Sequence, residues 1–312
     1  MRRFILVLLL ILLGAAPAAA QRRIALTFDD VPRGRGAFFT PDERATRLIA
    51  QLRRARVSQA AFFITTGNLE RPDGTGGEAR IATYAAAGHV LGNHSHSHLW
   101  ATRTPVEAYV ADLDRAARWL SRRPGWRPWY RFPFLDEGRD TKERRDALRR
   151  ALAQRGLSSG YVTVDSYDWH LESLTNQAVR AGRTVDRAAL RRLYVEAVLG
   201  AAEFNDRIAV ETLGRSPAHV LLLHETDLAA LFIGDAVAAL RAAGWEIVSA
   251  DEAFHDPIAA IEPDSMFLGG GRIAAIANAR GREPRTLVPQ WNEEDFLTRL
   301  FNTRVLHQEA TP

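Results

Sequence analysis

The sequence has 312 residues, with 41 basic and 37 acidic side chains and no cysteine. The absence of cysteine excludes disulfides and zinc–thiolate sites, so any bound metal must be held by histidine and carboxylate side chains. The formal charge of +4 comes from arginines that are spread along helical segments with acids between them. This pattern argues against a nucleic-acid-binding surface.

The first twenty residues have the features of an export signal. Arg2 and Arg3 precede an apolar run at residues 4–13, and alanines at 18–20 supply a cleavage site. The run is shorter than the roughly 20 residues that cross a bilayer, and no second run of that length follows. We therefore expect a signal peptide at residues 1–20, cleavage near Ala20, and an exported protein, periplasmic or secreted, without stable membrane insertion. An uncleaved N-terminal anchor is the alternative.

Beyond this signal, short apolar runs alternate with helical patterns, which is typical of a parallel sheet covered by helices. Expected strands cover residues 24–28, 60–65, 89–93, 130–134, 160–164, 220–223 and 246–248. Expected helices cover residues 41–55, 79–87, 105–120, 141–154, 187–204 and 235–243. The pattern predicts an α/β fold with about seven strand–helix units in a single domain at residues 21–255. Residues 256–312 have a loop-rich composition with a short helix near 293–301, and we expect them to form a C-terminal extension packed on that domain.

Polar side chains follow five of the expected strands at the point where each strand ends. The clusters are Asp29 and Asp30, His94 and His98, Arg131, Asp165 and Asp168, and His224. In a parallel α/β barrel the carboxyl ends of the strands meet on one rim, where catalytic groups are assembled. The five clusters are therefore expected to converge.

The aspartate pair and the histidine cluster indicate a metal site. On an extended strand Asp29 and Asp30 point to opposite sides, but a turn at the strand end can aim both inward, one as ligand and one as base. His94 and His98, four residues apart, would share a helix face and reach one ion, whereas His96 points elsewhere. Such a site suits metal-assisted hydrolysis. The alternatives are an ordinary turn aspartate pair and a loop of solvated histidines.

The other three clusters are weaker signals taken singly. Arg131 precedes a rigid Phe-Pro-Phe turn and can hold a carboxylate through paired hydrogen bonds. Asp168 is followed by Trp169, and an aromatic ring beside a carboxylate suits a sugar, although Trp169 could equally belong to the core. His224 ends the apolar run 220–223, where a lone histidine is more often a structural group.

Taken in order, the five clusters resemble the five motifs of the polysaccharide deacetylases, the NodB homology domain of carbohydrate esterase family 4. The resemblance runs from Thr27 to about Val248. It implies a distorted (β/α)7 barrel and a hydrolase of carbon–nitrogen bonds that removes N-acetyl groups from a glucosamine-containing glycan, such as a chitooligosaccharide or peptidoglycan, and releases acetate. Two alternatives stay open: a metal-dependent amidase or esterase with a non-glycan substrate, and a non-catalytic carbohydrate-binding relative.

The resemblance also implies roles for individual residues. Asp30, His94 and His98 would hold one divalent cation. We expect this ion to be Zn²⁺, with Co²⁺, Ni²⁺ and Mn²⁺ as the alternatives. Asp29 would be the general base and Arg131 would orient it. The N–H of Phe134 would bind the oxyanion. His224 would be the general acid, tuned by Asp168, with Trp169 and Leu222 shaping the acetyl pocket.

This sequence departs from the family pattern at three places. Val31 stands where the family usually has glycine after the aspartate pair, and we expect its larger side chain to narrow the loop there. Phe134 replaces a tyrosine that often follows the third-motif proline, but it keeps the backbone donor. Residues 171–218 form a longer insertion than expected between the fourth and fifth motifs. The particular glycan and the oligomeric state are therefore left open.

Overall fold

The computed structural model describes residues 21–308. The expected signal peptide at residues 1–20 and the last four residues lie outside this part. Within residues 21–308, no helix combines the length and the apolar character that a membrane crossing requires.

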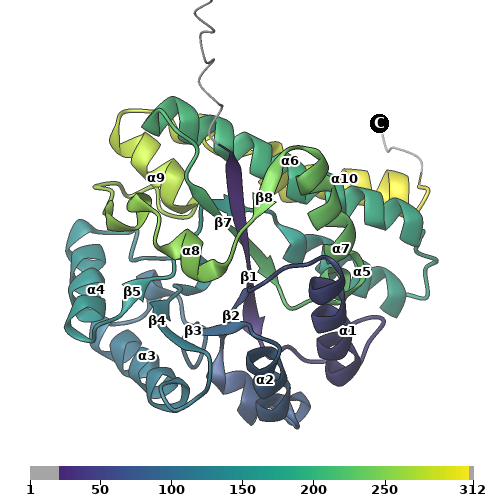
Figure 1. The fold of residues 1–312 in the computed structure, drawn as a ribbon, viewed down its shortest axis with the longest axis horizontal. Helices are drawn as coiled ribbons and strands as arrows, with labels where there is room; N and C mark the ends of the chain where they lie inside the picture. Colours follow the sequence, from purple (N-terminus) through teal and green to yellow (C-terminus); the bar gives the residue numbers. More distant parts are fainter. Residues whose placement is uncertain (1–20, 309–312) are drawn as a thin grey trace, which may run out of the picture.

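The centre of the molecule is a curved sheet in which every pair of neighbouring strands is parallel (Figure 1). The strands are β1 (Arg22–Val31), β2 (Ala61–Ile64), β3 (Val90–Asn93), β4 (Trp126–Tyr130), β5 (Ser158–Ser159), β6 (Val164–Asp165), β7 (Ala218–His224) and β8 (Trp245–Ile247). Their order is β5-β4-β3-β2-β1-β7-β6, with β8 paired to the start of β1. The predicted α/β fold of the distorted (β/α)7 barrel type is confirmed.

Helices surround the sheet, as the ribbon drawing shows (Figure 1). They are α1 (Pro41–Arg54), α2 (Gly77–Ala86), α3 (Val106–Leu120), α4 (Lys142–Gln154), α5 (Asp168–Arg180), α6 (Arg187–Leu213), α7 (Asp227–Ala242), α8 (Ala250–Phe254), α9 (Gly271–Ala279) and α10 (Glu294–Leu300). Side-chain hydrogen bonds at the N-terminus define where several of these helices begin. For example, Thr40 caps α1 through a reciprocal pair of hydrogen bonds with Glu43, and Pro41 occupies the first turn.

Side chains along β1 point alternately into the apolar core and into the interior of the barrel. Ile24, Leu26 and Phe28 are fully buried in the apolar layer between sheet and helices, and each such side chain contributes about 1.5–3 kcal/mol of burial free energy. Successive strand side chains point to opposite faces, so Thr27 and Asp29 face the other way, into the barrel. The buried Thr27 hydroxyl donates to the Leu221 carbonyl oxygen at 2.8 Å. The hydrophobic pattern of β1 therefore determines which side chains face the interior of the barrel.

Two of the expected strands are wrong in their extents. Residues 130–134 do not continue a strand: β4 ends at Tyr130, and Pro133 starts a single turn of 3₁₀ helix instead. The fixed φ of proline suits the first position of a helical turn, which is the position that Pro133 occupies. Residues 160–164 are not one strand either, because β5 ends at Ser159 and β6 begins at Val164.

Helices are more extensive than expected between residues 168 and 280. The insertion 171–218 contains most of α5 and the whole of α6, and α6 runs nine residues beyond the predicted end at 204. Gly200 in α6 lies against the Trp291 ring, where a Cβ would come within 1.9 Å of the indole nitrogen. This close contact explains a glycine inside a long helix. Helix α9, which the sequence analysis missed, packs against α6.

Candidate active site

Asp29 and Asp30 both reach the site because β1 is irregular at its end. The pairing with β2 shifts register between Phe28 and Val31, and Asp30 has a left-handed φ of 65°. A bulge of this kind re-aims a side chain that regular alternation would turn away. The turn at the end of β1 thus brings both carboxylates to the same cavity.

His94 and His98 meet through a loop, so the expected shared helix face is wrong. Residues 94–98 have no helical assignment, and Ser95 and His98 have left-handed φ values of 69° and 55°. Two hydrogen bonds fix the loop: the Ser95 N–H donates to Asn93 Oδ1 at 2.8 Å, and the His98 N–H donates to Ser95 Oγ at 2.9 Å. The two imidazole rings lie 4.9 Å apart, edge to face.

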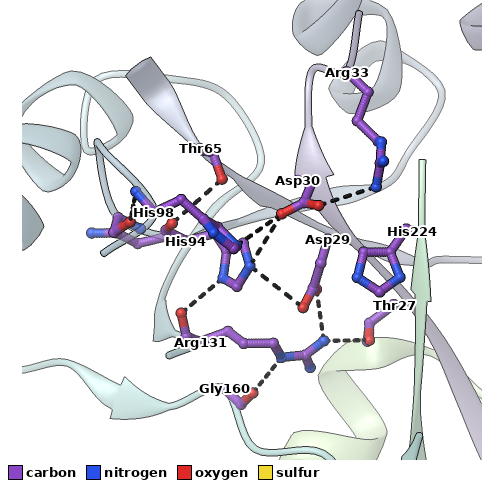
Figure 2. Close-up of polar contacts among 12 residues, drawn as sticks. Thr27, Asp29, Asp30, Arg33, Thr65, His94, His98, Arg131, Gly160 and His224 are labelled. Atoms are coloured by element: carbon purple, nitrogen blue, oxygen red, sulfur yellow. Dashed lines mark hydrogen bonds and ion pairs between the residues drawn. The ribbon is translucent and has the colours of Figure 1, made fainter. Parts of the chain in front are cut away.

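Asp30, His94 and His98 place three ligand atoms within 4.8 Å of one another (Figure 2). Asp30 Oδ1 lies 3.0 Å from His98 Nε2 and 3.6 Å from His94 Nε2. Tetrahedral zinc with bonds of about 2.0–2.2 Å separates its ligands by about 3.4 Å, so these spacings fit one such ion. This trio is the one group of three or more candidate ligands found within the described residues.

The protonation states of these groups also suit a cation. Burial lowers the pKa of His94 to about 4, so the ring is neutral at neutral pH. Its Nδ1 donates to the Arg131 carbonyl oxygen at 2.9 Å, which leaves Nε2 free to act as a ligand. Burial alone would raise the pKa of Asp30, but the hydrogen bond with His98 and the charge of Arg33 hold it well below its usual range.

Arg131 lies behind Asp29 and fixes its carboxylate. Both side chains are buried, and Arg131 Nη1 donates to Asp29 Oδ1 at 2.8 Å and to Thr27 Oγ1 at 2.7 Å. Its Nε donates to the Gly160 carbonyl oxygen at 2.7 Å, and its guanidinium lies 3.9 Å from the centre of the Phe63 ring. The guanidinium is thus held from several directions, and the position of Asp29 is fixed with it (Figure 2).

His224 stands beside Asp29 because β1 and β7 pair in register, with Asp29 opposite His224. Asp168 Oδ1 lies 2.7 Å from His224 Nδ1, and Asp168 Oδ2 accepts the His224 backbone N–H at 2.9 Å. Burial would lower the pKa of His224, but the charge and hydrogen bond of Asp168 raise it to about 9. His224 is therefore mostly protonated at neutral pH.

A cavity of about 730 Å³ connects these groups, a size within the usual range for ligand sites. Eight of the ten expected site residues line it: Asp29, Asp30, His94, His98, Phe134, Trp169, Leu222 and His224. The other two, Arg131 and Asp168, lie behind the wall and contact Asp29 and His224. The structure thus brings together all ten residues that the sequence analysis named.

Phe134 and Trp100 form an aromatic wall beside the histidines. Their rings are parallel, with centres 3.8 Å apart, and the Phe134 ring meets the His98 ring edge to face at 4.5 Å. Phe134 has a left-handed φ of 59°, and its backbone N–H donates no hydrogen bond within the described residues. A free N–H in this position is available to an incoming oxygen atom.

Sequence reasoning missed much of the remaining wall. Helix α5 contributes Ser173, Asn176, Gln177 and Arg180 after the expected Trp169. These residues recur at intervals of three and four, which is one helix face, and the assignment of residues 171–218 to an insertion hid that signal. Arg33, Trp100, Arg139, Gly269 and Glu294 also line the cavity and were not predicted.

Three further side chains, His96, His89 and Asp165, have definite places in the structure. His96 is buried and its Nδ1 lies 2.9 Å from Thr66 Oγ1, outside the ligand trio, as expected. His89 is packed beside Phe62, and its Nδ1 accepts the Ala60 N–H at 3.2 Å. Asp165 lines the cavity, and burial raises its pKa to about 6.

Comparisons with known proteins find a family match over part of the chain and several solved structures of similar fold. The family model described as polysaccharide deacetylase matches residues 16–158. A family 4 carbohydrate esterase from Streptomyces lividans, solved with acetate, is 20% identical with a TM-score of 0.50, over 78% of this chain and 98% of that one. A family 4 pseudoenzyme from Bacillus anthracis is 15% identical with a TM-score of 0.50, over 75% of this chain and 66% of that one. A search of curated protein sequences finds no match.

The structural matches, at these identities, establish the fold alone. They include a mutant pseudoenzyme of the same family with restored enzymatic activity, 16% identical with a TM-score of 0.51, over 75% of this chain and 68% of that one. The family model and the shared fold confirm the resemblance that the five motifs indicated: residues 16–158 match the polysaccharide deacetylase family, and the chain has the fold of family 4 carbohydrate esterases.

Proposed function

We propose that this chain is a metal-dependent deacetylase that hydrolyses N-acetyl groups on a glucosamine-containing glycan and releases acetate. One observation carries the proposal: a single cavity holds a ligand trio, a fixed carboxylate and a protonated histidine. Amide hydrolysis needs these three elements together, because water must be activated, negative charge stabilised and the amine protonated as it leaves.

Asp30, His94 and His98 would hold the cation, since their spacing and protonation fit zinc. When bound, a divalent cation supplies Lewis-acid polarisation and makes water easier to deprotonate. The remaining steps belong to side chains and backbone groups of this chain.

Asp29 is proposed as the general base that takes a proton from the attacking water. One oxygen of this carboxylate, Oδ1, already accepts a hydrogen bond from Arg131 Nη1 at 2.8 Å. Oδ2 lies 3.7 Å from His94 Nε2, on the side of the ligand trio. A base that is already oriented toward the reacting water avoids the entropic cost of positioning it during the reaction.

His224 is proposed as the general acid. As the carbon–nitrogen bond breaks, the nitrogen takes the electron pair and needs a proton, which His224 supplies from its ring. Asp168 occupies Nδ1, so Nε2 is the nitrogen that faces the substrate. The water oxygen ends in acetate, the acid proton ends on the amine, and Asp29 and His224 then exchange their protons with solvent.

Phe134, Trp169 and Leu222 are proposed to shape the acyl site. The free N–H of Phe134 would donate to the oxyanion, a kind of contact whose loss typically costs about 10²–10³ in rate. Trp169 and Leu222 line the same cavity and supply apolar surface for the acetyl methyl group.

Catalysis does not follow from the fold, because two of the structural matches are described as a pseudoenzyme and its reactivated mutant. The proposal is tested by acetate release from chitooligosaccharides, peptidoglycan fragments, acetylated xylan and small amides, with Zn²⁺, Co²⁺ or Ni²⁺ supplied. We expect release from an N-acetylated glycan, and at least a 100-fold loss in Asp29→Asn. Glycan binding without acetate release at saturating metal would identify a non-catalytic binding protein instead, and release only from small amides would indicate a non-glycan amidase.

Export is a further part of the proposal and rests on the sequence of residues 2–20. N-terminal sequencing of protein recovered outside the cytoplasm should begin at or near Gln21. Recovery of a chain that still carries residues 1–20 would contradict cleavage.

A further inference from the structure

Arg33 lies at the edge of the ligand trio and contacts its one carboxylate. Arg33 Nη1 donates to Asp30 Oδ2 at 3.1 Å (Figure 2). The other oxygen of Asp30, Oδ1, faces the imidazoles, 3.0 Å from His98 Nε2 and 3.6 Å from His94 Nε2. The two oxygens of this carboxylate therefore have different partners: Oδ1 belongs to the ligand trio and Oδ2 to the guanidinium.

Buried groups fix the backbone of Arg33 on both sides of its Cα. The Arg33 N–H donates to Glu225 Oε2 at 2.7 Å, and the Arg33 carbonyl oxygen accepts from Arg44 Nη2 at 2.6 Å. Glu225 and Arg44 are both buried. Buried charges are retained only where they are paired and hydrogen-bonded, so this pair of contacts leaves the loop after β1 little freedom.

Three helices support the two buried groups. Tyr84 on α2 donates its hydroxyl to Glu225 Oε1 at 2.7 Å. Arg44 lies on α1, and its Nη1 donates to Oδ1 of Asp227, the first residue of α7, at 3.1 Å. The packing of these helices thus fixes the Arg33 backbone independently of the contact with Asp30.

Asp30 is fixed from the other side. Asn68 Nδ2 donates to the Asp30 carbonyl oxygen at 3.1 Å, and Asp30 has the left-handed φ of 65° described above. The side chains of Arg33 and Asp30 are 31% and 25% exposed. An ion pair as exposed as this contributes little to folding stability, so its effect is on the carboxylate that it orients.

A carboxylate with one oxygen already hydrogen-bonded offers the other oxygen to a cation. This arrangement suits Zn²⁺, which takes four ligands in most protein sites. Ca²⁺ takes six to eight oxygen ligands and often both oxygens of a carboxylate, and Mn²⁺ also favours sites rich in oxygen.

We propose that Arg33 is a positioning residue that restricts Asp30 to one metal-binding oxygen and so favours Zn²⁺ over ions that take more oxygen ligands. The inference rests on the metal site of the proposed function. It assigns a role to a residue that lies outside the five motif clusters.

The test compares two arginines of the same loop. Arg33→Met removes the hydrogen bond to Asp30 Oδ2, whereas Arg35 is exposed and lies outside the set of residues that line the cavity. Arg35→Met therefore removes the same charge two residues away. Metal-free wild type and both variants are titrated calorimetrically with Zn²⁺ and with Mn²⁺, and the visible absorption of bound Co²⁺ is recorded. The Co²⁺ bands weaken as the number of ligands rises, so they report the ligation of Asp30 without any need for activity. Melting temperatures check that the variants fold.

Arg33→Met should lower the ratio of Zn²⁺ to Mn²⁺ affinity by about tenfold, because changes in outer-shell partners typically alter metal affinity by about 10–100-fold. It should also weaken the Co²⁺ bands, since Asp30 can then bind through both oxygens. Arg35→Met should leave the ratio and the bands as in wild type, and both variants should melt close to wild type.

An unchanged affinity ratio or an unchanged Co²⁺ spectrum in Arg33→Met would overturn the role of Arg33. Equal changes in Arg35→Met would overturn it as well, because net charge alone would then account for the effect. Acetate release is measured separately on the Zn²⁺-loaded proteins. Its absence with every substrate, together with the expected metal results, would reject the deacetylase function and leave the role of Arg33 standing.

Discussion

Asp168 holds His224 at two points, through the ring and through the backbone. One carboxylate oxygen lies 2.7 Å from Nδ1, and the other accepts the backbone N–H at 2.9 Å. Asp168 itself begins α5, directly after the left-handed Tyr167, so the start of this helix places the carboxylate. The same contact positions the ring and raises its pKa to about 9.

Replacing Asp168 by asparagine should therefore lower the pKa of His224. Burial, which lowers this pKa, remains in the variant, while the opposing charge is removed. An adjacent opposite charge typically shifts a pKa by about 1–3 units. Because a general acid works only when protonated, activity falls as pH rises through this pKa, so the alkaline limb of the pH–rate profile should move to lower pH in Asp168→Asn.

The shift can be measured apart from activity by following the His224 ring resonances by NMR in metal-free protein. His219 provides an internal reference, since it is buried and lies 3.2 Å from the carboxylate of Asp206, not Asp168. Equal His224 titration in wild type and Asp168→Asn would show that Asp168 does not tune the ring.

Metal binding should depend on His94 and not on His96. The two side chains are buried in the same loop, but only His94 belongs to the ligand trio, and His96 contacts Thr66 instead. His94→Ala should weaken Zn²⁺ binding by more than about 100-fold, beyond the usual effect of removing an outer-shell partner. The readouts are calorimetric titration with Zn²⁺ and the rise in melting temperature on its addition, which reports binding to the folded state.

His96→Ala is the control and should keep both the affinity and the thermal shift within a small factor of wild type. Similar Zn²⁺ affinity in His94→Ala and wild type would contradict the assignment of the trio.

Arg131 should matter far more to stability than Arg127, although the two lie four residues apart. Arg131 is buried with Asp29, so Arg131→Met leaves an unpaired buried carboxylate, at a cost of about 3–5 kcal/mol. The ion pair of Arg127 with Asp251 is about one-third exposed on each side, so Arg127→Met should cost less than about 1 kcal/mol. Urea unfolding midpoints compare the two, and equal midpoints would show that Arg131 does not carry a buried charge pair.

The strand ends at Asp29 and His224 could be read from the sequence because each follows a largely apolar run. The run before Asp29 and the run before His224 place both residues on neighbouring parallel strands, and the register of β1 with β7 then pairs them. The identity of all ten proposed site residues follows from such positions together with the family motifs. The turn that brings Asp29 and Asp30 to the same side could also be predicted, since adjacent residues of a regular strand point to opposite faces.

The histidine loop and the C-terminal segment could not be read in this way. The His94–His98 contact depends on left-handed residues held by Ser95 and Asn93, and i,i+4 spacing suggested a helix instead. The walls contributed by Gly269 and Glu294 depend on packing between segments more than 100 residues from the motif strands at the start of the chain. Local patterns carry no information on such contacts.

The last prediction separates the Phe134 backbone from its ring. If the N–H binds the oxyanion, Phe134→Ala and Phe134→Gly keep the donor and should retain kcat within about tenfold, because losing an oxyanion donor typically costs about 10²–10³. Both variants lose the ring that stacks on Trp100 and meets His98, so KM should rise by up to about tenfold. Glycine also relieves the left-handed φ of 59°, so Phe134→Gly should be the more stable of the two. Steady-state kinetics and thermal melts test both points, and a 100-fold fall in kcat for either variant would transfer the catalytic role from the backbone to the ring.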